Sequence, residues 1–60
     1  MFNTDVRAAI RKARLFSYEV AEALGMSESY FSRKMTRKEM DSEEKKRILA
    51  VIERLVREVQ

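Results

Sequence analysis

The sequence predicts an all-α fold, a compact domain of four helices in which the last helix is the longest. Three observations support this. The 60 residues contain no Pro and only one Gly, so almost nothing interrupts a helix. Apolar residues recur at intervals of three and four, which is the helical period. Candidate cap residues divide the chain into four such segments. A chain this short accommodates one hydrophobic core, so residues 1–60 are expected to form a single domain.

The composition excludes several classes of function. The chain has no Cys and no His, so disulfides, zinc-finger ligation, thiol chemistry and imidazole catalysis are not expected. It also lacks a Gly-rich phosphate loop, which leaves an enzyme as the least expected class, with no metal and no small-molecule cofactor. No stretch approaches the roughly 20 apolar residues of a membrane span, and the first ten residues lack the layout of a signal peptide. The sequence therefore predicts a cytoplasmic protein without a membrane partner.

The positive charge is unevenly placed along the chain. The net charge is +3, and residues 41–60 are balanced, so the whole excess lies in residues 1–40. Four cations fall within six positions, at Arg33, Lys34, Arg37 and Lys38. Such a run either concentrates positive potential for an anionic partner or is simply a solvated helix face.

The first two helices are predicted from caps and apolar stripes. Helix 4–15 is expected to begin after Asn3 or Thr4 as N-cap and to bury Val6 and Ile10. Ser17 is the expected N-cap of a short helix, residues 18–24, which ends at the glycine because that residue readily adopts a left-handed conformation. Its apolar stripe consists of Val20, Ala21 and Leu24.

The third helix is predicted at residues 27–35. Ser27 is its N-cap candidate, Met26 packs beneath the preceding turn, and Phe31 and Met35 lie one turn apart on the inner side. The opposite face carries short hydroxyl side chains and charged groups. Such a face can approach another molecule closely.

The fourth helix is predicted to follow a polar connector, residues 36–40, and to run to about Val59. Asp41 and Glu44 have the spacing of a capping box at its start. Its apolar stripe extends further than three short helices need. The surplus either covers the first helix and Phe2 or forms a homodimer contact, for which the candidates are Ile52, Leu55, Val56 and Val59.

The spacing of the second and third helices predicts a helix-turn-helix. Ala21 lies where the two helices would cross, Gly25 at the turn, and Phe31 where the chain returns to the core. Through residues 10–35, IRKARLFSYEVAEALGMSESYFSRKM, the sequence closely resembles the phage-repressor and Cro-like family of bacterial and phage helix-turn-helix proteins. This resemblance implies that the third helix lies in the major groove, that the second crosses the DNA backbone, and that the protein binds as a dimer.

The resemblance also implies roles for individual residues. The groove-facing set is Ser27, Glu28, Ser29, Ser32 and Arg33, and Ser17 and Tyr18 lie near a phosphate. The chemistry of the side chains adds further phosphate contacts at Lys34, Arg37 and Lys38. Tyr30 either reaches a phosphate or covers the edge of the helix. Two departures from the family are visible. Ser17 stands where many relatives have a DNA-contacting Gln, and one long helix replaces the family's last two, so the family's dimer mode is not carried over.

The chemistry of the proposed readers differs from residue to residue. The guanidinium of Arg33 can pair with both O6 and N7 of guanine, which makes it the first choice for base reading. Glu28 either stabilises the helix N-terminus electrostatically or accepts a hydrogen bond from cytosine N4. Ser29 and Ser32 can bond to bases or phosphate but specify little by themselves.

Three functions are compatible with these patterns. The leading hypothesis is a sequence-specific double-stranded DNA-binding protein, a small nucleoid-associated transcriptional regulator of repressor type from a bacterium, phage or mobile element. The second is a protein-interaction module, such as an antirepressor or accessory factor, that binds a regulatory protein with the same surface. The third is an architectural or recombination accessory protein that bends DNA.

Overall fold

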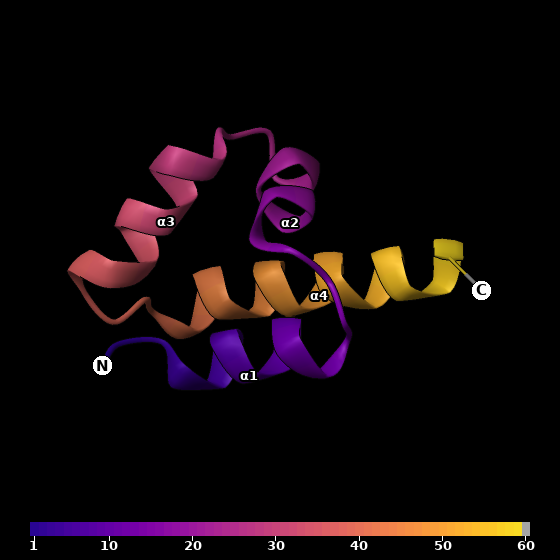
Figure 1. Cartoon of the computed structure of the whole chain (residues 1–60). Helices are drawn as coiled ribbons and strands as arrows, with labels where there is room; N and C mark the ends of the chain where they lie inside the picture. The colour runs from indigo at the N-terminus through magenta and orange to yellow at the C-terminus, as the bar shows by residue number, and fades with distance from the viewer. Residues whose placement is uncertain (60) are drawn as a thin grey trace.

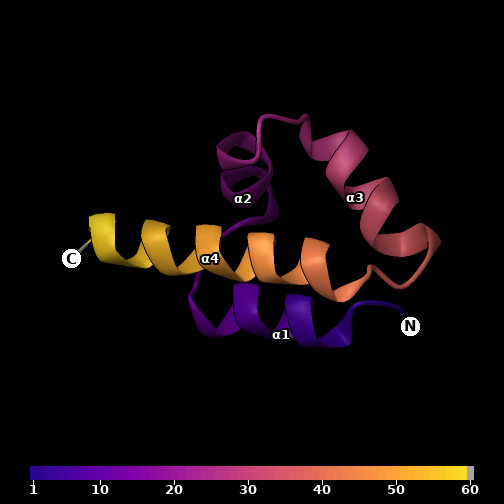
Figure 2. The same cartoon turned by 180° about the vertical axis from the view of Figure 1, so that it is seen from behind.

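The computed structural model describes residues 1–59 and confirms the all-α fold. Its four helices are α1 (Thr4–Lys12), α2 (Ser17–Ala23), α3 (Glu28–Arg37) and α4 (Ser42–Val59). α4 runs through the middle of the molecule, with α1 along one side and the α2–α3 pair on the other (Figure 1). The view from behind shows the same order, so α1 and α3 lie on opposite sides of α4 (Figure 2).

The hydrophobic core lies where the four helices meet. Phe31 is its largest fully buried side chain, and Ala21 is also fully buried. Four of the residues predicted for the core of the α2–α3 unit are buried, and Leu24 and Met26 pack against that core from partly exposed positions. The buried apolar set is Val6, Ile10, Val20, Ala21, Phe31, Met35, Met40, Ile48 and Ile52.

The turn between α2 and α3 has the predicted geometry. Gly25 is left-handed with a φ of 78°, and its N–H donates to the carbonyl of Glu22. The N–H of Met26 donates to the carbonyl of Ala21 over 3.0 Å. These two bonds form a Schellman motif, which satisfies the free carbonyls of the last turn and reverses the chain.

α1 ends earlier than predicted, because a second Schellman motif closes it. The prediction extended this helix to Leu15, whereas the last helical residue is Lys12. Arg14 takes the left-handed conformation with a φ of 59°, and the N–H of Leu15 donates to the carbonyl of Ile10 over 3.1 Å. A residue with a Cβ is disfavoured in this conformation, so an arginine at position 14 does not indicate the end of a helix.

α2 begins one residue earlier than predicted. Phe16 is the N-cap residue, in an extended conformation, and Ser17 is the first helical residue rather than the cap. The prediction favoured Ser17 because a hydroxyl can accept a bond from a free N–H. The N–H groups of Glu19 and Val20 instead donate to the backbone carbonyl of Phe16.

α3 starts as predicted and ends two residues later. Ser27 is the N-cap, and its hydroxyl oxygen accepts a hydrogen bond from the N–H of Tyr30 over 3.2 Å. The helix continues through Arg37, so the predicted polar connector begins only at Lys38. Within that connector Met40 is buried in the core, which the prediction of a polar segment missed.

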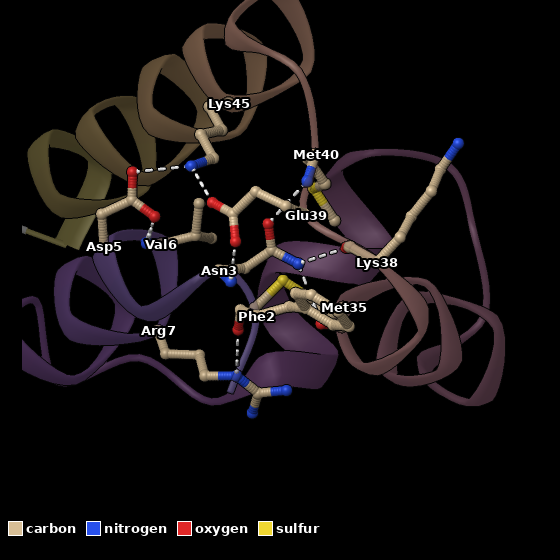
Figure 3. A network of polar contacts seen from close by, with 10 residues as sticks. All are labelled: Phe2, Asn3, Asp5, Val6, Arg7, Met35, Lys38, Glu39, Met40 and Lys45. Carbon is tan, nitrogen blue, oxygen red and sulfur yellow. Dashed lines mark hydrogen bonds and ion pairs between the residues drawn. The ribbon is translucent and has the colours of Figure 1, made fainter.

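Asn3 and its partners form a polar network that we call the N-terminal anchor (Figure 3). Its side-chain amide donates to the carbonyls of Met35 and Lys38 and accepts from the N–H of Met40. Its own N–H donates to the carboxylate of Glu39. Asn3 is the N-cap residue of α1, in agreement with the prediction, but its side chain makes no capping hydrogen bond. Asn3 is instead left-handed and fully buried, and its side chain bonds to the end of α3.

α4 begins with Asp41 as its cap and continues to Val59, as predicted. The N–H of Glu44 donates to Asp41 Oδ1 over 2.8 Å. Ile52 is buried in the chain's own core, and Leu55 and Val56 are partly buried against it. These three residues therefore pack within their own domain, and only Leu55 and Val56 keep an exposed part. The side chain of Val59 is outside the described residues. None of the described helices is long and apolar enough to cross a membrane.

Candidate nucleic-acid interface

The outer surface of α2 and α3 carries the residues that sequence analysis selected. All five predicted base contacts lie in or directly before α3, and all five are exposed: Ser27, Glu28, Ser29, Ser32 and Arg33. Ser27 already uses its hydroxyl oxygen to cap α3. The other four side chains form no hydrogen bond or ion pair with the chain in the range 1–59.

Ser17 lies beside the first turns of α3. Together with Glu28, Ser29 and Ser32 it lines a shallow depression of about 260 Å³, here called the serine hollow. The packing of α2 on α3 thus brings together a residue predicted to approach phosphate and three residues predicted to face bases. The side chains around the serine hollow are short, so another molecule can come close to the α3 backbone.

Most of the predicted phosphate contacts gather at a second depression, nearer the C-terminal end of α3. It has a volume of about 240 Å³ and is here called the cationic hollow. Its lining consists of Tyr30, Arg33, Lys34, Arg37 and Lys38. Arg33, selected as a base reader, therefore lies with the predicted phosphate contacts and not with the serines.

The four cations of the cationic hollow are not equally available. Arg33, Arg37 and Lys38 are exposed, and their charged groups have no ion-pair partner in the described part of the chain. Lys34 is partly buried, forms an ion pair with Glu44 of α4, and lies 5.9 Å from the centre of the Tyr30 ring. The hydrogen bond from Lys34 to Glu44 raises the pKa of Lys34 above its usual 10.5. Lys34 therefore remains charged at neutral pH but already has a partner.

An exposed aromatic pair marks the start of α2. The rings of Phe16 and Tyr18 stack with centroids 5.6 Å apart and an interplanar angle of 14°. Both rings remain about half or more exposed, Phe16 at 64% and Tyr18 at 51%. Tyr18 was predicted to approach phosphate. Phe16 was not among the predicted contact residues, although the sequence shows an apolar residue directly before a helix that begins with Ser17.

The arrangement is suited to binding a polyanion. Within residues 1–59, no three carboxylate, Cys or His side chains come together to hold a metal ion. The two hollows instead offer hydroxyl groups, one carboxylate and four cationic groups, which come from α3, from Ser17 at the start of α2 and from Lys38 directly after α3. Hydroxyl and cationic side chains are the groups that proteins use to bind phosphates and base edges.

Two residues matter to this surface that the sequence pattern did not select. Asn3 bonds to the end of α3 from 32 positions away in the chain. Glu44 of α4 forms an ion pair with Lys34. The pattern offered only local roles for them, as an N-cap and as part of a capping box. No signal in a single sequence indicates contacts between such distant positions.

Comparison with models of known protein families gives no match, and comparisons with curated proteins and with solved structures also give none.

Proposed function

We propose that this chain is a sequence-specific double-stranded DNA-binding protein, a small transcriptional regulator of repressor type. In this proposal α2 and α3 form a helix-turn-helix, and α3 enters the major groove, which is wide enough to admit an α-helix. The observation that carries the proposal is the pair of adjacent hollows on exposed α3, one lined by hydroxyls and one by cations. A protein with this role is expected in the cytoplasm, associated with the nucleoid.

The two hollows divide the work of binding. Ser29 and Ser32 are assigned to base edges, because their short side chains let the α3 backbone come close to the groove floor. Glu28 is assigned to cytosine, whose N4 amino group can donate to its carboxylate. Arg37 and Lys38 are assigned to phosphates, which fix the register of the helix without reading sequence. Arg33 lines the cationic hollow and follows Ser32 directly in the chain, and its guanidinium is assigned to guanine at the edge of the site.

The remaining residues of the proposed contact are assigned to the phosphate backbone. Ser17 and Tyr18 are assigned to the phosphate backbone at the start of α2, and Tyr30 to a phosphate beside the cationic hollow. Lys34 joins the phosphate contacts once it is released from Glu44. The proposed activity is occupation of an operator, and no residue is assigned a catalytic role.

Dimerisation is part of the proposal, since one copy of so small a reader contacts few base pairs. Two copies bound to an inverted repeat would contact half-sites about 34 to 36 Å apart, one turn of the duplex. Ile52 is buried within its own domain, so the proposed contact uses the partly exposed Leu55 and Val56.

Fluorescence anisotropy with a labelled duplex tests the DNA-binding part of the proposal. Arg37→Ala is expected to weaken binding to all sequences and to reduce the salt slope by about one unit. Lys12→Ala is the matched control, because Lys12 is an exposed cation on α1, on the other side of α4. Equal losses for the two variants, or no binding by the wild type at physiological salt, would contradict the proposal.

The exposed stack of Phe16 and Tyr18 favours a second candidate, a protein-interaction module such as an antirepressor or accessory factor. Exposed aromatic side chains are enriched among the residues that dominate protein interfaces, and Glu28 repels phosphate. A double Phe16→Ala and Tyr18→Ala variant distinguishes the candidates. Loss of a protein partner with unchanged duplex binding would support the second, whereas reduced duplex binding would assign the stack to the DNA interface.

A further inference from the structure

Glu44 is the one residue outside the α2–α3 unit that pairs with a cation of the cationic hollow within residues 1–59. It belongs to the first turn of α4, where its N–H is held by the cap residue Asp41. In a capping box the Glu44 side chain would return to the N–H of Asp41. Here the carboxylate reaches Lys34 of α3 instead. The fold thus replaces a local capping contact with one between helices.

The environment of the pair distinguishes it from the two ion pairs along the outer face of α4. The side chains of Lys34 and Glu44 are 34% and 27% exposed, whereas the two pairs along the outer face of α4 involve side chains that are 60% to 76% exposed. Lys34 lies between two depressions: the cationic hollow and a small apolar one that it lines with Glu44, Arg47 and Met40. Water screens such a partly covered pair less than it screens a fully exposed one.

We propose that Glu44 restrains the DNA affinity of α3 by occupying Lys34, so that binding requires Lys34 to exchange the Glu44 carboxylate for a phosphate. This inference rests on the proposed function, because it assigns regulation to the same site. Before binding, Arg33, Arg37 and Lys38 present the free positive charge of the hollow, and Glu44 offsets the fourth cation. The exchange lowers affinity for every sequence alike, since phosphates carry no sequence information.

The chain offers a matched control for this exchange. Glu43 is the adjacent residue of the same turn of α4, carries the same charge and is exposed. No ion pair holds Glu43 in the described part of the chain. Glu43→Gln therefore changes the net charge as Glu44→Gln does, but it leaves the Lys34 pair intact. A difference between the two variants reports the pair and not the overall field of the protein.

A double-mutant cycle on duplex binding tests the inference. Glu44→Gln is expected to tighten binding about threefold to tenfold, as for the loss of a partly exposed ion pair. Glu43→Gln is expected to tighten it by about twofold or less, as for the loss of a single unpaired surface charge. Lys34→Gln is expected to weaken binding more in the Glu44→Gln background than in the wild type, because only there is Lys34 free before binding. Thermal melts of each variant verify that the fold is retained.

The outcomes separate this inference from the proposed function. If the wild type binds duplex and Arg37→Ala weakens it, but the effects of Lys34→Gln and Glu44→Gln are additive, then Glu44 does not restrain Lys34 and the inference fails alone. Equal gains for Glu43→Gln and Glu44→Gln would overturn it as well. If the wild type binds no duplex, both the proposed function and the inference fail.

Discussion

The side-chain amide of Asn3 donates a hydrogen bond of 2.8 Å to the backbone carbonyl of Met35, joining the start of the chain to the last turns of α3. The same amide reaches the carbonyl of Lys38 and the N–H of Met40, so it satisfies backbone groups where α3 ends and the next segment begins. The position of the cationic hollow therefore depends on a residue that lies outside the α2–α3 unit.

Asn3→Ala is expected to destabilise the fold by about 2 to 4 kcal/mol, because it leaves two carbonyls and one N–H without their buried partner. The left-handed backbone of Asn3 adds to the effect, since Ala is less tolerant of it. Urea titration measures the change.

Asn3→Asp serves as the matched variant. It keeps the acceptor for the Met40 N–H but places a carboxylate oxygen against the Met35 and Lys38 carbonyls. It is therefore expected to be destabilising as well. An Asp variant as stable as the wild type would show that the donated bonds contribute nothing.

The two left-handed residues that follow helix C-termini, Arg14 and Gly25, predict opposite effects of substitution. Arg14→Gly is expected to stabilise the fold, and Gly25→Ala to destabilise it, each by about 1 kcal/mol. A methyl group at Gly25 would meet no atom within 4 Å, so its cost comes from the backbone alone. Thermal unfolding of both variants checks the signs; a destabilising Arg14→Gly would mean that the arginine side chain contributes more than its backbone strain costs.

Met40→Ala tests whether the connector between α3 and α4 contributes to the hydrophobic core. Met40 is 5% exposed and packs in the core, so its truncation is expected to cost about 2 to 4 kcal/mol. Met1→Ala is the control, because Met1 is 96% exposed and should tolerate the change. If the two variants are equally stable, residues 38–41 form a solvated linker that contributes nothing to the core.

Glu39 connects the N-terminal anchor to Lys45, which also pairs with Asp5, and these ion pairs are expected to weaken in acid. The bond from Lys45 lowers the pKa of Asp5 below its ordinary 3.8, and the Asn3 N–H followed by Lys45 lowers that of Glu39 below 4.5. A lowered pKa in the folded state means that the unfolded chain binds more protons. The two carboxylates therefore contribute fully to stability at a pH above their ordinary pKa values. This contribution is lost as the pH falls through their lower pKa values in the folded state.

Glu39→Gln provides the comparison, because it keeps an oxygen for the Asn3 N–H while removing the charge that Lys45 contacts. Its melting temperature is expected to be lower than that of the wild type at pH 7 and to change less between about pH 5 and pH 3. Parallel pH curves for the two proteins would exclude Glu39 as a source of the acid sensitivity.

Sequence analysis identified the four helices because their signals are local. The apolar stripe of α4, the hydroxyl cap at Ser27 and the glycine at position 25 act within one or two turns, and the structure has each of them in the predicted place. The early end of α1 was not predictable in this way, since Arg14 is an unfavourable choice for its conformation.

The features that sequence analysis missed depend on contacts between distant segments. Met40 belongs to the core because the chain turns inward between α3 and α4, and Asn3 is buried because the N-terminal segment lies beside that turn. Likewise, the grouping of Arg33 with Lys34 and Arg37 follows from helical spacing, but the capture of Lys34 by Glu44 requires α3 and α4 to be packed together.

Sequence reading by α3 is tested by selection of bound duplexes from a random-sequence library, at roughly 0.15 M salt and with the wild type and Arg33→Ala in parallel. We expect enrichment of an inverted repeat with half-sites one helical turn apart, altered by the substitution at one position in each half. Absence of any enriched sequence with the wild type would contradict sequence-specific DNA binding through α3.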